Sequence, residues 1–217
     1  MKTKKFEQSM QKIKVKLEEE DKIRDSVIHQ QRRIIRICSE AIKSIHRKEF
    51  DVADKKIAEA QEMLKEVLTM VKGLNSLECW RGLDDAAQEL GEAIFISSMV
   101  RYDEIPSIED CQITFTSYML AASDAIGELR RFMMDSLRTN DFDNAQRAFD
   151  YMDYLYSELM TVDYTKMLVG PLRSKLDVAR NLVNRTRSDL INAKQAFELK
   201  ESMQNLSDKL DKVKKEK

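Results

Sequence analysis

The scarcity of helix-breaking residues constrains the fold of this chain more than any other feature. Only five Gly and two Pro occur among its 217 residues. An all-β fold needs a turn about every ten residues, and Gly and Pro are among the commonest residues in such turns. The composition therefore excludes an all-β fold and predicts an all-α protein, built as one helical bundle with extensions.

Apolar residues at helical spacing, together with the breaks between them, predict seven helices. The first is long because no Gly or Pro interrupts it. Gly73 and the following Asn75 and Ser76 are expected to end the second helix, and Pro171 to begin the seventh. The predicted helices span about 3–48, 51–71, 83–102, 109–138 and 143–162, a short segment ending at Gly170, and the chain from Pro171 onward.

A short internal similarity bears on two of the helix starts. Residues 49–57 and 141–149 each contain a Phe, an Asp directly after it and an Ala two positions further on. An Asp at the N-cap accepts a hydrogen bond from an otherwise unpaired N–H of the first turn. We therefore predict Asp51 and Asp143 as N-caps, and we interpret the similarity as a shared helix start, not as a sequence repeat.

Both ends of the chain show the alternating spacing of three and four that is typical of a coiled-coil seam. We expect a helical N-terminal extension at residues 1–20, a central helical domain at 21–198 and a coiled-coil-like tail at 199–217. The pattern leaves open whether the ends pair with each other, pair with a neighbouring subunit or fray. The seam residues are Phe6, Met10, Ile13 and Leu17, and then Leu199, Met203, Leu206, Leu210 and Val213.

Several classes of protein are excluded by what the sequence lacks. No apolar run approaches the ~18 residues of a membrane span, and the first residues lack the apolar core of a signal peptide, so we expect a cytoplasmic protein with no membrane contact. Cys38, Cys79 and Cys111 form no C-x-x-C pair, which indicates reduced thiols used as small apolar residues. No phosphate-binding Gly loop and no nucleophile elbow is present.

Four acidic residues lie in stretches that are otherwise poor in charge. At 35% charged residues overall, the 15 residues at 86–100 and the 19 at 111–129 should hold about five and about seven charges. Each holds two: Glu89 and Glu92 in the first, Asp124 and Glu128 in the second. Spacings of three and four place each pair on one helical face.

Adjacent carboxylates in an apolar helix need compensating charge or solvent. Ion pairs with basic residues of neighbouring helices, internal water and a metal ion all meet this need, and the residues alone leave the choice open. If a metal is bound, an all-carboxylate set predicts Mg²⁺ or Mn²⁺. A di-iron bundle is not indicated, because neither His29 nor His46 is part of a Glu-x-x-His motif.

Basic residues are concentrated on two of the predicted helices. His29, Arg32, Arg33 and Arg36 lie close together on the first, and basic residues recur every seven positions on the last. Such stripes can neutralise the phosphates of a single strand without reading its sequence. Solvent exposure or ion pairing with neighbouring acids is the alternative for each of them. The second stripe comprises Arg173, Arg180, Arg187 and Lys194.

The two acidic segments, QELGEA at residues 88–93 and DAIGEL at 124–129, resemble the motifs of the translin family, and in particular of its catalytic branch, translin-associated factor X. The basic stretch at residues 24–47 and the seven-helix layout are also similar to that family. The resemblance covers about residues 20–198. The sequence is compact, and one chain would carry both the binding and the cleavage role. In this it is similar to the archaeal, single-chain members of the family.

This resemblance implies a seven-helix fold that assembles into a closed homo-oligomeric shell, an octamer in the family, and binds single-stranded RNA and DNA. It further implies an endoribonuclease whose metal-holding and catalytic acids match Glu89, Glu92, Asp124 and Glu128, with Mg²⁺ or Mn²⁺ as cofactor. His29, Arg32, Arg33 and Arg36 would then bind the nucleic acid. Two alternatives stay open: a nucleic-acid-binding scaffold without cleavage, and a helical bundle that binds protein partners.

Overall fold

The structure is a computed structural model that describes residues 3–72 and 77–215, with the side chains of 77–81, 210, 211 and 213–215 omitted. The described residues form helices and connecting turns and contain no strand, which confirms the all-α prediction. The elements are α1 (Lys4–His46), α2 (Phe50–Met70), α3 (Leu77–Ser97), the π-helix η1 (Ser98–Tyr102), α4 (Ile108–Cys111), α5 (Phe115–Arg138), α6 (Phe142–Leu159), α7 (Lys166–Val169) and α8 (Leu172–Lys215).

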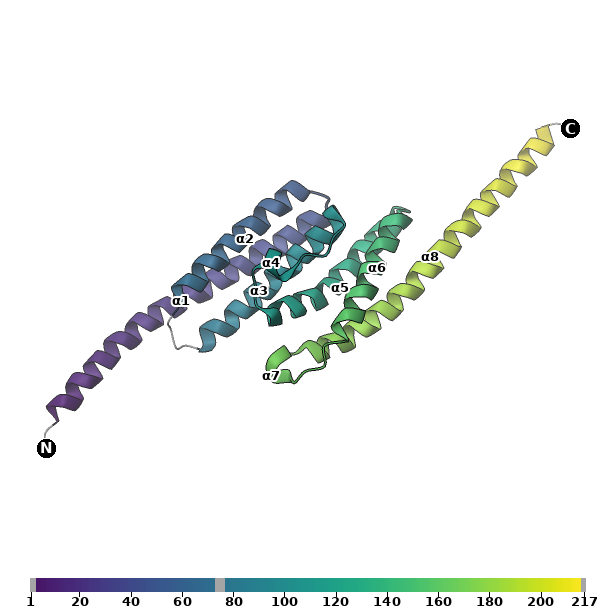
Figure 1. Cartoon of the computed structure of the whole chain (residues 1–217). Helices are drawn as coiled ribbons and strands as arrows, with labels where there is room; N and C mark the ends of the chain where they lie inside the picture. Colours follow the sequence, from purple (N-terminus) through teal and green to yellow (C-terminus); the bar gives the residue numbers. More distant parts are fainter. Residues whose placement is uncertain (1–2, 73–76, 216–217) are drawn as a thin grey trace. The chain divides into compact units, whose positions relative to one another are not determined.

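The chain divides into two compact units, Met1–Ala122 and Ser123–Lys217, so that α5 begins in the first and continues in the second. In the first unit α1, α2 and α3 pack against one another (Figure 1). Helix α2 presents a buried residue at every third or fourth position, which is the period of one helical face. These residues are Ala53, Ile57, Ala60, Leu64 and Val67, and they face buried residues of α1 and α3.

The second unit is built on α8, which packs along α6 (Figure 1). Its buried positions alternate in steps of four and three, as in a coiled-coil seam. Arg130 of α5 donates to Thr186 and Asp189 of α8, which ties these two helices together as well. The buried positions of α8 are Leu172, Leu176, Ala179, Val183, Thr186 and Leu190.

Helix boundaries agree with the sequence where a break has one clear cause. The first helix is a single element, and the short helix α7 is followed by Gly170 with a φ of 59°, which suits a residue without a side chain. Pro171 directly precedes α8. Gly73, Asn75 and Ser76, predicted to end the second helix, lie outside the described residues, as do the side chains of Cys79, Leu210 and Val213.

The predicted N-caps Asp51 and Asp143 are both two residues too late. The caps are Glu49 and Asp141, and the Asp141 side chain accepts a hydrogen bond from Asn144 N–H at 3.2 Å. Both starts follow a left-handed residue, Lys48 or Asn140. In each case the cap N–H donates at 2.9 Å to a buried Ser five residues earlier, Ser44 or Ser136. The similarity therefore begins before residues 49 and 141, in a shared helix-end turn.

The predicted fourth helix is two helices. Helix α4 ends at Gln112, which is left-handed with a φ of 54°, and α5 begins at Phe115. Thr114 Oγ1 accepts a hydrogen bond from Ser117 N–H, so this hydroxyl satisfies a backbone donor of the new helix. Ser107 and Asp110 form a capping box at the start of α4. The residues at the break between α4 and α5 include no Gly or Pro, so the sequence contains no clear signal of a helix end there.

The described residues toward both ends of the chain are helical, and most of their described side chains are exposed. The N-terminal part of α1 runs beyond α2, and the C-terminal part of α8 runs beyond α6 (Figure 1). Among the seam residues with described side chains, Met10 is half-buried and the others, such as Phe6, Leu17 and Leu199, are exposed. Both helices continue without interruption across the predicted boundaries at residues 20 and 198. None of the described helices has the length and apolar character that a membrane crossing requires.

Candidate functional site

The first acidic pair lies on α3, on the side of that helix that faces α1. Glu89 and Glu92 are half-buried, and Cys38 of α1 is completely buried near them. Burial, and then the charges of Glu89 and Glu92, raise the pKa of the Cys38 thiol to about 12. Both carboxylates therefore lie near enough to Cys38 for their charges to act on its thiol.

Close packing holds this part of α3 in place. Gly91 lies between the two acids, and a methyl group added to it would come within 2.7 Å of the Ala121 side chain and of Ile113. Ala121 belongs to the first turns of α5, and the Phe95 ring packs on Tyr118 of the same helix at 5.0 Å between centroids. The absence of a side chain at residue 91 thus allows α5 to approach the helix that carries Glu89 and Glu92.

The second acidic pair lies on the part of α5 that belongs to the second unit. Asp124 and Glu128 are one turn apart, and both side chains are about a quarter exposed. Asp124 accepts a hydrogen bond from Lys175 of α8 at 2.5 Å, and Glu128 lies 3.5 Å from Arg131 on its own helix. Ion pairing with basic residues, one of the alternatives left open by the sequence, thus occurs at both acids.

The donor chemistry of the four acids fits a hard cation. Carboxylate oxygens suit Mg²⁺ and Mn²⁺, and each pair presents two of them on one helical face. Within each unit, the described residues contain no group of three or more His, Cys, Asp or Glu side chains arranged to hold a metal.

The predicted nucleic-acid-binding residues are exposed on α1. His29, Arg32, Arg33 and Arg36 all reach solvent, although Arg33 also bonds Glu59 of α2 at 3.0 Å. The same part of α1 carries Glu40. A hydrogen bond from Lys56 and the positive charge of Lys56 lower the pKa of Glu40 most, and the charges of Lys43 and Arg36 lower it less. This face of α1 is thus basic and accessible, with Arg33 partly neutralised.

The basic stripe on α8 has a different role from the one its spacing suggested. Arg187 bonds Asp153 at 2.8 Å and lies over the Phe149 ring, while Lys194 donates to Gln146. Arg180 donates to the Tyr156 hydroxyl at 2.9 Å. These partners all belong to α6, so three of the four residues of the stripe join two helices of the second unit. Arg173 is exposed and lies 3.8 Å from the equally exposed Asp163.

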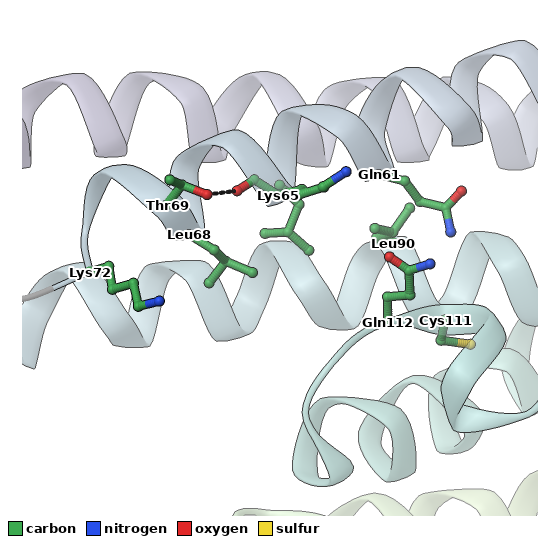
Figure 2. Close-up of a pocket in the computed structure, with 9 residues that line it drawn as sticks. Gln61, Lys65, Leu68, Thr69, Lys72, Leu90, Cys111 and Gln112 are labelled. Atoms are coloured by element: carbon green, nitrogen blue, oxygen red, sulfur yellow. Dashed lines mark hydrogen bonds between the residues drawn. The ribbon is translucent and has the colours of Figure 1, made fainter.

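A pocket of about 220 Å³ lies between α2, α3 and α4. Its lining includes Lys65 of α2, Lys72 beyond the end of that helix, Leu90 of α3 and Gln112, all of which are labelled in Figure 2. Leu90 is the neighbour of Glu89 in the sequence, yet neither Glu89 nor Glu92 lines the pocket. The pocket and the acidic pair therefore use different faces of α3.

A cluster around Arg101, which the sequence did not indicate, fixes the end of α3. Arg101 lies in the π-helix η1, bonds Asp51 at 3.0 Å and also pairs with Asp54. Its guanidinium lies over the Phe50 ring, and Tyr102 donates to Asp54. No motif signals this cluster, because it joins η1 to the start of α2 across about fifty residues.

Comparison with known proteins decides the family. The model of the translin family matches residues 15–188. The chain belongs to the translin family. A relative of this translin-family protein, MJ0175 of Methanocaldococcus jannaschii, is 31% identical over 196 residues, which cover 88% of this chain and 85% of that protein.

Solved structures have the same fold as this translin-family chain. A complex of AfC3PO with duplex RNA matches it with a TM-score of 0.80 and 30% identity, covering 87% of this chain and 97% of that one. AfC3PO in a second structure matches with a TM-score of 0.76 and 30% identity, covering 87% and 98%. Apo-NeC3PO, at 21% identity and a TM-score of 0.77 over 85% and 96% of the two chains, supports the fold alone.

The region that matches the translin family contains every predicted site residue, from His29 to Glu128, and ends before the C-terminal tail at 199–217. Within this translin fold, Glu89 and Glu92 are brought together beside Cys38, and Asp124 and Glu128 beside basic side chains. Cys38 and Lys175 were not predicted as site residues. Nothing in their local sequence marks them, because each acquires its place from a partner on another helix.

Proposed function

We propose that this translin-family chain is a single-stranded RNA-binding protein with divalent-metal-dependent endoribonuclease activity, as in the catalytic branch that includes translin-associated factor X. The observation that carries the proposal is the pair of half-buried carboxylates, Glu89 and Glu92, one turn apart on an otherwise apolar stretch of α3 and near the buried Cys38 of α1. The second pair, Asp124 and Glu128, has the same one-turn spacing on α5.

RNA as the substrate is supported by the relative whose structure contains it. AfC3PO, 30% identical to this chain, is described in complex with duplex RNA. In this chain the exposed residues His29, Arg32, Arg33 and Arg36 offer positive charge to a phosphate backbone. Contacts of this kind do not depend on base sequence, so single-stranded DNA is expected to bind as well.

Each group of residues has a separate task in the proposed reaction. Glu89, Glu92, Asp124 and Glu128 would hold Mg²⁺ or Mn²⁺, and the bound ion would offset the repulsion between these carboxylates and the phosphates of the strand. Such an ion supplies Lewis-acid activation of water and charge stabilisation at the scissile phosphate. The basic face of α1 would retain the strand, and the Arg101 cluster would hold the end of α3 on α2.

Assembly completes the proposal. We infer a closed homo-oligomeric shell, an octamer as the family suggests, in which one kind of chain both binds and cuts, as in the archaeal single-chain form, and which works in the cytoplasm. A shell admits short single strands more readily than long duplexes. The preference for short strands would therefore disappear in a monomeric variant, although each chain would keep its acids.

Cleavage of labelled single-stranded RNA tests the proposed activity. Wild-type protein is expected to cut the RNA with Mg²⁺ or Mn²⁺ and to stop when a chelator is added. Glu92→Gln and Asp124→Asn should each lower the rate at least about a hundredfold, because each removes a ligand charge while keeping the shape. Asp143→Asn is the matched control, since Asp143 lies exposed on α6. If the wild-type protein left the RNA intact in the presence of Mg²⁺ or Mn²⁺, the proposed endoribonuclease activity would be refuted.

A nucleic-acid-binding scaffold without catalysis is the second candidate. The ion pairs Asp124–Lys175 and Glu128–Arg131 favour it, because acids that are balanced by the chain's own cations need no metal. This candidate predicts RNA binding that is equal with Mg²⁺ and with chelator, with no cleavage in either case. It also predicts that Glu92→Gln leaves RNA binding unchanged.

A further inference from the structure

We propose that Lys175 is a positioning residue that competes with the metal ion for Asp124 and is released toward the RNA phosphate when the ion binds. The inference rests on the proposed function, because it concerns the same acids. It adds a residue that lies outside both acidic segments, on the helix α8.

The contact is specific in its geometry. Lys175 Nζ lies 2.5 Å from Asp124 Oδ1, and both side chains are about a quarter exposed, at 27% and 26%. The pair joins α8 to α5 within the second unit, 51 residues apart in the sequence. Partial burial reduces screening by solvent, so this ion pair is stronger than the exposed pairs elsewhere on the surface.

Other basic residues of α8 are directed elsewhere. Arg187 and Lys194 bond Asp153 and Gln146 of α6 and thereby join two helices along the core of the unit. Lys175 instead approaches the acid that the translin-like motif on α5 supplies. The ion pair at Glu128 is weaker than the Lys175–Asp124 pair, because Arg131 lies 3.5 Å away on the same helix and its side chain is half exposed.

Competition follows from charge. A divalent cation at the Asp124 carboxylate and an ammonium group in contact with the same carboxylate repel each other, so binding of the ion displaces the lysine. The displaced ammonium remains on a flexible four-carbon stem next to the acids. A lysine of this kind binds phosphate oxygens as a point charge, which is the group that the proposed reaction brings to the site.

Manganese affinity, measured without RNA, tests this directly. Mn²⁺ binding is followed by electron paramagnetic resonance on wild type, Lys175→Met, Lys175→Gln and the control Lys194→Met. Loss of the competing charge should tighten Mn²⁺ binding about tenfold in Lys175→Met. Lys175→Gln, which keeps a hydrogen-bond donor and provides a second variant if Lys175→Met unfolds, should change it in the same direction. Lys194→Met should behave as wild type.

A second readout follows the released lysine. With Mn²⁺ at saturation, Lys175→Met should bind single-stranded RNA several-fold more weakly than wild type, and Lys175→Arg should restore the affinity. In chelator, where the lysine is held by Asp124, the same variant should bind RNA as wild type does. Equal RNA affinity of the Lys175→Met variant and wild type at saturating Mn²⁺ would overturn the released-lysine step.

The outcomes separate this inference from the proposed function. If wild type binds Mn²⁺ and cuts RNA but Lys175→Met and Lys175→Gln leave the Mn²⁺ affinity unchanged, the competition is refuted and the nuclease stands. A purely structural ion pair would give this result, together with a lower unfolding temperature. If wild type neither binds Mn²⁺ nor cuts RNA, both proposals are refuted.

Discussion

At the scale of single residues, the two acidic segments differ in what surrounds their glycines. Gly91 directly precedes Glu92 and Gly127 directly precedes Glu128, so the sequence treats them as equivalent. The structure separates them: a methyl group at residue 91 would meet the Ala121 side chain at 2.7 Å, whereas one at residue 127 has no described heavy atom within 4 Å. Only the first glycine is required by packing.

Substitution of the two glycines should therefore have opposite effects on stability. Gly91→Ala is expected to lower the free energy of unfolding by about 1–3 kcal/mol, since Ala121 is attached directly to the backbone and cannot turn away. Gly127→Ala should raise it by up to about 1 kcal/mol, because Ala is the better helix former. Urea unfolding of both variants in chelator measures this. If both variants lost a similar free energy of unfolding, the inferred difference in packing around the two glycines would be wrong.

The two buried thiols predict how stability depends on pH. The pKa values of Cys38 and Cys111 are raised from 9.0 to about 12, mainly by burial. Between these values the unfolded chain releases both protons and the folded chain keeps them, so stability falls as the pH rises.

Stability should fall by about 1.4 kcal/mol per pH unit for each thiol over that range. Urea unfolding of a Cys79→Ser variant at pH 8 and pH 10 measures the fall. The same variant with Cys38→Ala and Cys111→Ala added is the comparison, and its free energy of unfolding should change much less between the two pH values. Parallel changes would mean that other groups cause the dependence.

At the scale of elements, periodicity and rare breakers predicted most helices, whereas hydrogen bonds at the helix ends decided the boundaries. Asp141 and Asp143 are chemically equal candidates for the cap of α6. The preceding turn selects Asp141 as the cap, because the left-handed Asn140 allows the Asp141 N–H to donate a hydrogen bond to the Ser136 carbonyl. The short break at Gln112 was missed for the same reason, since a left-handed Gln has no sequence signal.

The cap of α6 can be tested with a matched pair of variants. Asp141→Ala should lower the free energy of unfolding by about 1 kcal/mol, because it leaves the Asn144 N–H without its acceptor. Asp143→Ala should cost about 0.3 kcal/mol, the value of an exposed acid near a helix start. Chemical unfolding at neutral pH distinguishes them. If Asp143→Ala lowered the free energy of unfolding more than Asp141→Ala did, the N-cap predicted from the sequence, Asp143, would be supported instead.

At the scale of the whole molecule, the two terminal helices treat their apolar seams differently. In α1 the exposed residues Phe6 and Ile13 lie in the same seven-residue register as the buried Val27 and Ile34. In α8 the seam buried as far as Leu190 does not continue in register to the residues 199, 203 and 206. A one-residue change of phase rotates the tail's apolar stripe by about 100° around the helix.

The acids of the candidate site were predicted from charge contrast, because a carboxylate within an apolar stretch of helix can be recognised from the sequence alone. Their partners were not found. Lys175 lies 51 residues from Asp124 in the sequence, and Cys38 lies on a different helix from Glu89. Helical spacing fixes which residues share a face but not which helices face each other, so the balancing charges emerge only when the helices pack.

Removal of residues 199–217 is the test that belongs to this scale. The tail lies beyond the region that matches the translin family, and its seam residues with described side chains are exposed. The free energy of unfolding should therefore change by less than about 0.5 kcal/mol. Oligomeric mass by light scattering should also be retained, because the proposed shell depends on the family region. Loss of self-association in the truncated chain would contradict this and would favour a helical bundle that assembles through its terminal heptads.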